Sequence, residues 1–196
     1  MTSRWREIAV AGHTGDAATA RLALTDKDPV ARELGLGATL RLGVLSDADL
    51  RTALLDEAGS VRRRAAMIAG QRPSVSLGDV LDDPDATVVE AAAWACGEQE
   101  VVDADVLQKL IELGVTSLDA LVREACTAAL GAIGDPRGLP TILRGCTDKP
   151  AVRRRAVLAL APFDGEAVDA ALQAALVDRD WQVRQAAEDV LRASNG

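Results

Sequence analysis

The stretch VREACTAALGAIGDP at Val122–Pro136 decides the fold of this chain. After the valine, Cys126, Ala129 and Leu130 follow at spacings that bring all four side chains onto one face of an α-helix. The sequence Gly-Asp-Pro at 134–136 then ends the helix and starts a turn. The stretch therefore predicts a helix with one buried face, followed by a sharp change of direction.

The same pattern recurs along the whole chain. It begins at Val30, Val61, Val88, Val122, Val152 and Val183, with a mean spacing of about 31 residues. A second helix is expected before most of the next turns, at 47–56, 76–81, 106–113, 139–146 and 167–177, and two more at roughly 3–11 and 15–24. A fixed period of this length is typical of stacked helical repeats. We therefore predict an all-α solenoid with about six two-helix repeats and a leading N-terminal helix, about thirteen helices and no strands, in a single domain over 1–196.

Arginines directly after four of the valines predict a structural ladder. Each lies in the first turn of its helix, where the helix dipole disfavours a cation, so its recurrence implies an acidic partner. The arginines are Arg62, Arg123, Arg153 and Arg184, and the expected acids in the turns are Asp56, Asp119, Asp148 and Asp178. In the other two repeats, Ala31 and Val89 replace the arginine. Such pairs, within a repeat or between neighbours, would fix the angle at which repeats stack.

Two segments carry a resemblance to a known family. Asp148–Ala156 reads D-x-x-x-V-R-x-x-A, and Val122–Pro136 reads V-R-x-x-x-x-x-A-L-G-x-I-G-D-P. This pattern resembles HEAT repeats, in particular the short HEAT-like repeats of phycobilisome-lyase relatives, from about residue 25 to the C-terminus. The resemblance implies that the helices that begin with valine and arginine line the concave side of the solenoid.

With that orientation, helical geometry predicts which side chains face the groove. Counting each valine as place one, places three, six, seven and ten lie opposite the apolar stripe. Place six holds Gly35, Ala66, Ala93, Thr127, Val157 and Glu188, and place seven holds Leu36, Met67, Trp94, Ala128, Leu158 and Asp189. An exposed apolar row of this kind marks a binding surface, and a tryptophan is a natural anchor. The candidate partner-binding residues are Arg63, Met67, Trp94, Arg154 and Leu158. The open alternative is that place seven packs between repeats as core.

Composition narrows the class of protein. The chain has 22 basic and 30 acidic side chains, which disfavours general attraction to nucleic acid or to an anionic membrane. No apolar run has the roughly 18 residues needed to span a bilayer, and the N-terminus lacks the apolar core of a signal peptide. Cys96, Cys126 and Cys146 lie within helical patterns and are expected as buried free thiols. We therefore expect a cytoplasmic protein.

Residues that would support catalysis are scarce. His13 is the only histidine and is expected in an exposed glycine-rich turn at 12–15. With one histidine and scattered cysteines, the chain has no zinc-site spacing, no supported nucleophile–base pair and no phosphate-binding loop motif. We expect neither catalytic residues nor a cofactor.

The preferred hypothesis is a non-enzymatic scaffold that binds a protein or peptide in its concave groove, with acidic groups on the partner that match Arg63 and Arg154. Two alternatives stay open. One is nucleic-acid binding, as in the HEAT-like DNA-alkylation-repair glycosylases, which requires a basic, aromatic-rich groove. The other is an enzyme subunit similar to the bilin lyases.

Overall fold

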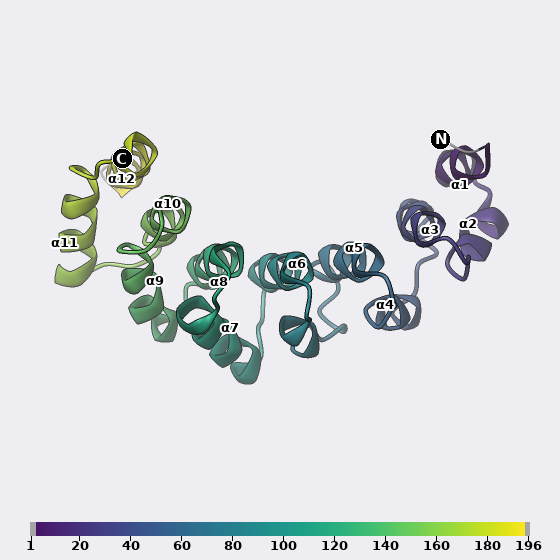
Figure 1. Ribbon diagram of the computed structural model, residues 1–196, viewed down its shortest axis with the longest axis horizontal. Coiled ribbons are helices and arrows are strands. Elements are labelled where there is room, and N and C mark those ends of the chain that lie inside the picture. Colours follow the sequence, from purple (N-terminus) through teal and green to yellow (C-terminus); the bar gives the residue numbers. More distant parts are fainter. Residues whose placement is uncertain (1–2, 195–196) are drawn as a thin grey trace. The chain divides into compact units, whose positions relative to one another are not determined.

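The computed structural model describes residues 3–194 of the chain. Within that range the structure has twelve α-helices, two short 3-10 helices and no strand, so the all-α prediction is confirmed (Figure 1). The residues form two compact units, Met1–Ser76 and Leu77–Gly196. The single domain over 1–196 stays a prediction, and the two units are described separately below.

The first unit contains five helices. They are α1 (Ser3–Thr14), α2 (Ala17–Ala23), α3 (Pro29–Arg41), α4 (Asp47–Ala53) and α5 (Gly59–Ala69). Helix α3 packs against α1, α2 and α5, and α4 packs against α5. Ile8, Ala23 and Ala31 form one small core cluster, which Trp5 and Leu34 cover. Helix α3 is therefore the centre of this unit.

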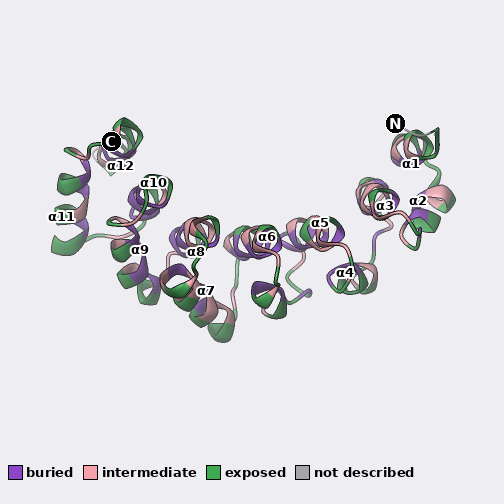
Figure 2. Cartoon of the chain, viewed as in Figure 1, coloured by how far each residue is buried: buried purple, intermediate pink, exposed green. Residues whose placement is uncertain are grey.

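The second unit contains two layers of helices. One layer holds α6 (Ala86–Gly97), α8 (Ala120–Ile133), α10 (Pro150–Ala159) and α12 (Trp181–Ser194). The other holds the 3-10 helix η1 (Asp79–Asp82), α7 (Ala104–Thr116), the 3-10 helix η2 (Pro136–Gly138), α9 (Leu139–Gly145) and α11 (Glu166–Ala175). Successive first-layer helices pack side by side. In this unit, Figure 2 shows buried residues between the helices and exposed residues on the outer sides of α7 and α11.

Aspartates start several of the helices. The side chains of Asp28, Asp85 and Asp119 accept hydrogen bonds from backbone N–H groups in the first turns of α3, α6 and α8. Ser46 and Asp49 cap α4 reciprocally, each side chain accepting from the other's backbone N–H. Such caps pair donors that have no partner inside the helix. The turn residues read from the sequence therefore fix where these helices begin.

The helical stripe is buried as expected in five of the six repeats. Val61, Val88, Val122, Val152 and Val183 are at most 4% exposed. The exception is α3, where Val30 is 38% exposed and Ala31 is fully buried. The predicted register of this repeat was therefore wrong by one residue. Because Asp28 caps the helix, the third helical residue, which faces the core in the other repeats, is Ala31.

The prediction that place six faces a groove was wrong. Ala66, Ala93, Thr127 and Val157 are all buried, and only Glu188 in the last repeat is exposed. Helices α8 and α10 each pack against a first-layer helix on both sides and against the second layer, so their buried arc is wider than the predicted stripe. In the corrected register of α3, place six is Leu36, which is 1% exposed. With α3 in that register, places three and seven keep accessible surface in every repeat, whereas place ten is buried at Gly70 and Gly131 and exposed at Ala161 and Arg192.

Two smaller expectations also differ from the structure. The helix expected at 76–81 is the short 3-10 helix η1, because Pro73 and Pro84 closely bracket the segment. His13 lies in the last turn of α1 rather than in a turn at 12–15, and the chain turns at Gly15, whose φ of 86° suits glycine. His13 is exposed. None of the helices in residues 3–194 has the length and apolar character that crossing a bilayer requires.

Candidate functional site

Arginine–aspartate pairs hold the first-layer helices of the second unit in place. Arg123 on α8 donates from Nε and Nη2 to the two carboxylate oxygens of Asp148, at 2.6 and 2.8 Å. Arg153 on α10 makes the same contact with Asp178, at 2.8 and 2.7 Å. The third nitrogen of each arginine donates to a backbone carbonyl of its own repeat, at Ser117 and Asp148 respectively. Each guanidinium therefore joins one repeat to the next.

These contacts also set the charge state of the acids. The hydrogen bond from Arg123 lowers the pKa of the Asp148 carboxyl, and the hydrogen bond from Arg153 lowers the pKa of Asp178. In both cases burial acts in the opposite direction but has the smaller effect. Both acids therefore stay ionised to a lower pH than a free aspartate.

The first unit contains an equivalent pair, which the predicted register of α3 missed. Arg32, not Ala31, occupies the ladder position of α3, and its Nε and Nη2 each lie 2.7 Å from a carboxylate oxygen of Asp56. Aligning the repeats on the capping aspartate and the arginine four residues later would have found it. Arg62 donates to the backbone carbonyl of Asp56 at 2.8 Å. Arg32 therefore pairs with the carboxylate of Asp56, whereas Arg62 contacts the backbone of the same residue.

Arg184 and Asp119 make local contacts within their own turns. Arg184 donates to the backbone carbonyl of Asp178 at 2.8 Å. Asp119 accepts from the N–H of Leu121 at 2.9 Å, and the two hydrogen bonds that Arg123 donates to a carboxylate go to Asp148 instead of Asp119. The reason is its position: Asp119 is the cap residue itself, and Ser117 stands two residues earlier, where Asp56 and Asp178 stand in their turns.

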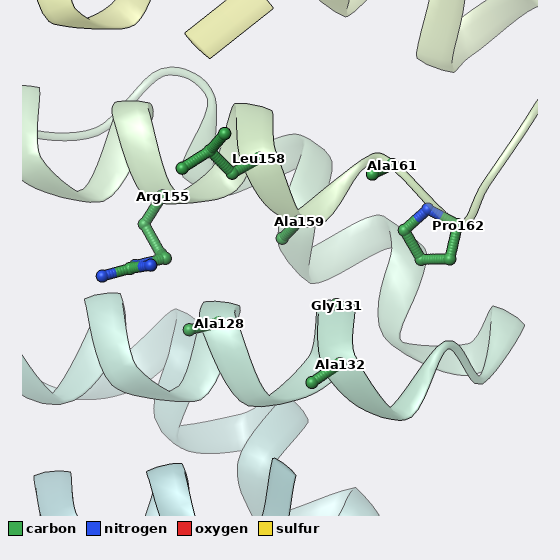
Figure 3. Close-up of a pocket in the computed structure, with 8 residues that line it drawn as sticks. All are labelled: Ala128, Gly131, Ala132, Arg155, Leu158, Ala159, Ala161 and Pro162. Carbon is green, nitrogen blue, oxygen red and sulfur yellow. The ribbon is translucent and has the colours of Figure 1, made fainter. Parts of the chain in front are cut away.

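A hollow of about 490 Å³ lies between α8 and α10 in the second unit. Its lining residues, labelled in Figure 3, are Ala128, Gly131, Ala132, Arg155, Leu158, Ala159, Ala161 and Pro162. Most of the lining side chains are small, which leaves the space between the helices open. The two helices approach closely where Gly131 faces Ala159. Leu158 is 37% exposed on one side of it. We call this the α8–α10 hollow.

Arg155 lies between the two helices at one end of the α8–α10 hollow, and its guanidinium points away from Gly131 and Ala159 (Figure 3). Its Nε is buried and has no hydrogen-bond partner within residues 3–194. The nearest acid is Glu124, whose Oε1 lies 3.7 Å from Nε, which is too far for a hydrogen bond. A buried N–H group without a partner is costly and uncommon. The Nε group itself is closed off from solvent, and the hollow presents the exposed remainder of the Arg155 side chain.

A second hollow, of about 220 Å³, lies on the other side of Leu158, between α10 and α12. Its lining includes Arg154, Leu158, Trp181, Gln185 and Asp189. Trp181 is 64% exposed, and Arg154 has no hydrogen bond or ion pair to any described residue. We call this the α10–α12 hollow. Leu158 is shared by both hollows, so the face of α10 combines an apolar centre with guanidinium groups on either side.

The five candidate binding residues fall into three groups. Arg154 and Leu158 line the same hollow, as their helical spacing implies. Trp94 belongs to the same layer and is 43% exposed, but it lies on α6 and lines neither hollow. Arg63, which is exposed, and Met67, which is half-buried, belong to the first unit. The structure therefore brings two of the five together.

Arg155 and Trp181 are site residues that the sequence reasoning did not select. Arg155 was visible as the third member of the triplet 153–155, but which of the three arginines joins the ladder depends on the neighbouring repeat. Trp181 lies at the first position of α12, outside the periodic places. The one feature of the sequence that could have indicated Trp181 is an aromatic residue at the start of a helix, where it is exposed.

Comparison with known proteins agrees with this repeat geometry. A family model described as HEAT repeats matches residues 48–131 and 107–192. The chain belongs to the HEAT-repeat family. The HEAT assignment covers both helices of most repeats, and no curated protein sequence matches the chain.

Solved structures with a similar fold are distant in sequence from this HEAT-repeat chain. A crystal structure of an engineered protein is 20% identical, with a TM-score of 0.50 over 98% of this chain and 90% of that one. Human deoxyhypusine hydroxylase in complex with glycerol is 20% identical, with a TM-score of 0.49 over 96% and 78% of the two chains. A designed armadillo repeat protein in complex with the peptide (KR)4 is 16% identical, with a TM-score of 0.48 over 96% and 85%. The first of these likenesses supports the helical-repeat fold.

Proposed function

We propose that this HEAT-repeat protein is a non-enzymatic, cytoplasmic scaffold that binds a protein segment on the α8–α10–α12 face of its second unit. The observation that carries the proposal is the pair of hollows on either side of Leu158, each with an arginine that has no hydrogen-bond partner. An apolar side chain of the partner would lie against Leu158 and Trp181. Its acidic or backbone carbonyl oxygens would accept from Arg154 and Arg155.

The chemistry of the face favours a peptide over nucleic acid. Glu124 lies beside Arg155 and Asp189 lines the same hollow as Arg154, so the two guanidinium groups are not part of a continuous basic strip. Phosphate-backbone binding depends on many cationic contacts in a row. A short segment with one apolar residue and one or two acidic residues matches what the face offers. Trp94 on α6 would extend the contact, and Arg63 and Met67 would form a separate contact in the first unit.

Binding to a defined peptide array tests the proposal. The array presents acidic segments with a central leucine or phenylalanine, and the same segments with lysine in place of each acid. We expect retention of the acidic set, and a weakening of at least about tenfold in the double variant Arg154→Glu/Arg155→Glu. Leu158→Ala should weaken binding of the same peptides.

Arg144→Glu is the matched control. Arg144 lies on α9 in the other layer, is exposed, and undergoes the same Arg→Glu replacement at one position, which is half of the charge change in the double variant. The affinity of the Arg144→Glu variant for the retained peptides should stay within about twofold of that of the unmodified protein. Equal losses in the control and the double variant, or retention of the lysine set instead of the acidic set, would show that the face is not the binding site. The finer likeness to the phycobilisome-lyase type of repeat would gain support only if a bilin changed colour on mixing.

A further inference from the structure

The first unit contains a polar hollow of its own, which is not part of the face proposed above. It has a volume of about 340 Å³ and lies beside α1, α3 and α5. Three of its lining residues carry basic side chains, one from each helix: His13 on α1, Arg41 on α3 and Arg64 on α5. Glu33 is the one acid in the lining. In a chain with a net charge of −8, three basic groups around one hollow are a local exception.

Two glycines leave room for the two guanidinium groups. A Cβ atom added at Gly12 would lie 3.1 Å from Nη1 of Arg41, and one added at Gly37 would lie 3.5 Å from Nη2 of Arg64. Each guanidinium therefore lies directly over the backbone of a neighbouring helix. Neither Arg41 nor Arg64 forms a hydrogen bond or ion pair with any residue in 3–194. The N–H donors of both arginines therefore have no protein acceptor in this part of the chain.

Helix electrostatics account for only part of this cluster. His13 and Arg41 lie in the last turns of α1 and α3, where a positive charge is stabilised by the helix dipole. Arg64 lies in the middle of α5, which has no basic residue in its last turn. No local interaction of its own helix requires the Arg64 charge at this position. Arg64 is therefore the residue that most directly suggests an anion in the hollow.

We propose that this hollow binds a phosphate monoester with a small apolar group. A phosphate monoester carries nearly two negative charges and three terminal oxygens, which suits basic groups that approach from three helices. A carboxylate has two oxygens, which a single arginine can satisfy. The apolar part of the ester would contact Val30, which is 38% exposed, and the half-buried Leu34. Glu33 disfavours longer polyanions, because it adds a negative charge within the same hollow.

The single histidine of the chain supplies the measurement. His13 gives a single Hε1 imidazole signal in a proton NMR spectrum, and that signal reports directly on the hollow. Phenyl phosphate, inorganic phosphate and benzoate are each titrated at constant pH and ionic strength. We expect a saturable shift with phenyl phosphate, weaker binding of inorganic phosphate, and the weakest binding with benzoate. Benzoate binding as tight as phenyl phosphate would overturn the phosphate assignment, and equal affinity for the two phosphates would overturn the apolar contact.

Charge-removing variants complete the test. Arg64→Gln, and independently Arg41→Gln, should each raise the apparent dissociation constant for phenyl phosphate at least about tenfold. Arg6→Gln is the control, because Arg6 is an exposed residue of α1 that does not line the hollow. Far-ultraviolet circular dichroism checks that each variant keeps its helices. A loss in Arg6→Gln equal to that in Arg64→Gln, or no saturable shift with phenyl phosphate in the unmodified protein, would overturn the proposal.

Discussion

Arg153 and Asp178 are joined by two parallel hydrogen bonds across neighbouring repeats, with Nε 2.8 Å from Oδ2 and Nη2 2.7 Å from Oδ1. The side chains are only 7% and 16% exposed. A third nitrogen of Arg153 donates to the carbonyl of Asp148 at 2.9 Å, so one guanidinium joins two successive turns. Geometry of this kind fixes both the distance and the angle between repeats.

Removing the Arg153 guanidinium should destabilise the second unit. Arg153→Ala leaves the carboxylate of Asp178 largely buried without its partner, and we expect a loss of about 2–3 kcal/mol in the free energy of unfolding. Urea unfolding followed by circular dichroism measures it. Arg192→Ala is the control, because the Arg192–Asp189 pair is exposed and should contribute far less. Equal losses in the two variants would contradict a structural role for the ladder.

The ladder acids should make stability depend on pH in the acidic range. Because the pKa values of Asp148 and Asp178 are lowered in the folded protein, their contribution is fully present above the unfolded pKa of about 3.9. That contribution is lost as the pH falls through the folded values. The double variant Asp148→Asn/Asp178→Asn should be less stable at neutral pH and should lose less stability between neutral pH and the acid limit. Parallel urea midpoints for the two proteins at every pH would refute this.

Two helical glycines should respond to alanine in opposite directions. A Cβ at Gly131 would lie 2.5 Å from the Cβ of Ala159 and 2.7 Å from its Cα, so Gly131→Ala should force α8 and α10 apart and cost about 1–3 kcal/mol. A Cβ at Gly37 meets only the end of the Arg64 side chain, so Gly37→Ala should stabilise its helix by about 0.5–1 kcal/mol. Thermal unfolding of both variants checks the signs. A stabilising Gly131→Ala would disprove the close contact of the two helices.

The three cysteines should react slowly in the folded protein. Burial raises the pKa of the Cys96 and Cys126 thiols to about 12, and that of Cys146 to about 11. Since the thiolate is the reactive form, a disulfide reagent at pH 8 should label few thiols before unfolding and all three afterwards. Cys146, which is half-buried, should react first, and Cys146→Ser should remove that early phase. Rapid labelling of Cys96 or Cys126 in native buffer would contradict their burial.

The candidate site was only partly accessible to sequence reasoning. Arg154 and Leu158 share one hollow because they are four residues apart on one helix, which the sequence states directly. Arg155 and Trp181 were not selected, because their role depends on the helices on either side of α10. The predicted register of α3 is wrong by one residue because it starts the repeat at the valine, although Asp28 and Arg32 have the capping and ladder roles there.

The sequence by itself determined the helices, their period and most of their ends, because capping, helical periodicity and turn formation involve residues within a few positions of one another. Its repeat also determined the membership in the HEAT family. Only the tertiary structure decided which arginine meets which aspartate, that place six is buried, and that the Nε of Arg155 lacks a partner. These properties depend on neighbouring repeats some 25 residues away. How closely those repeats approach is set by the packing of residues such as Gly131 against Ala159.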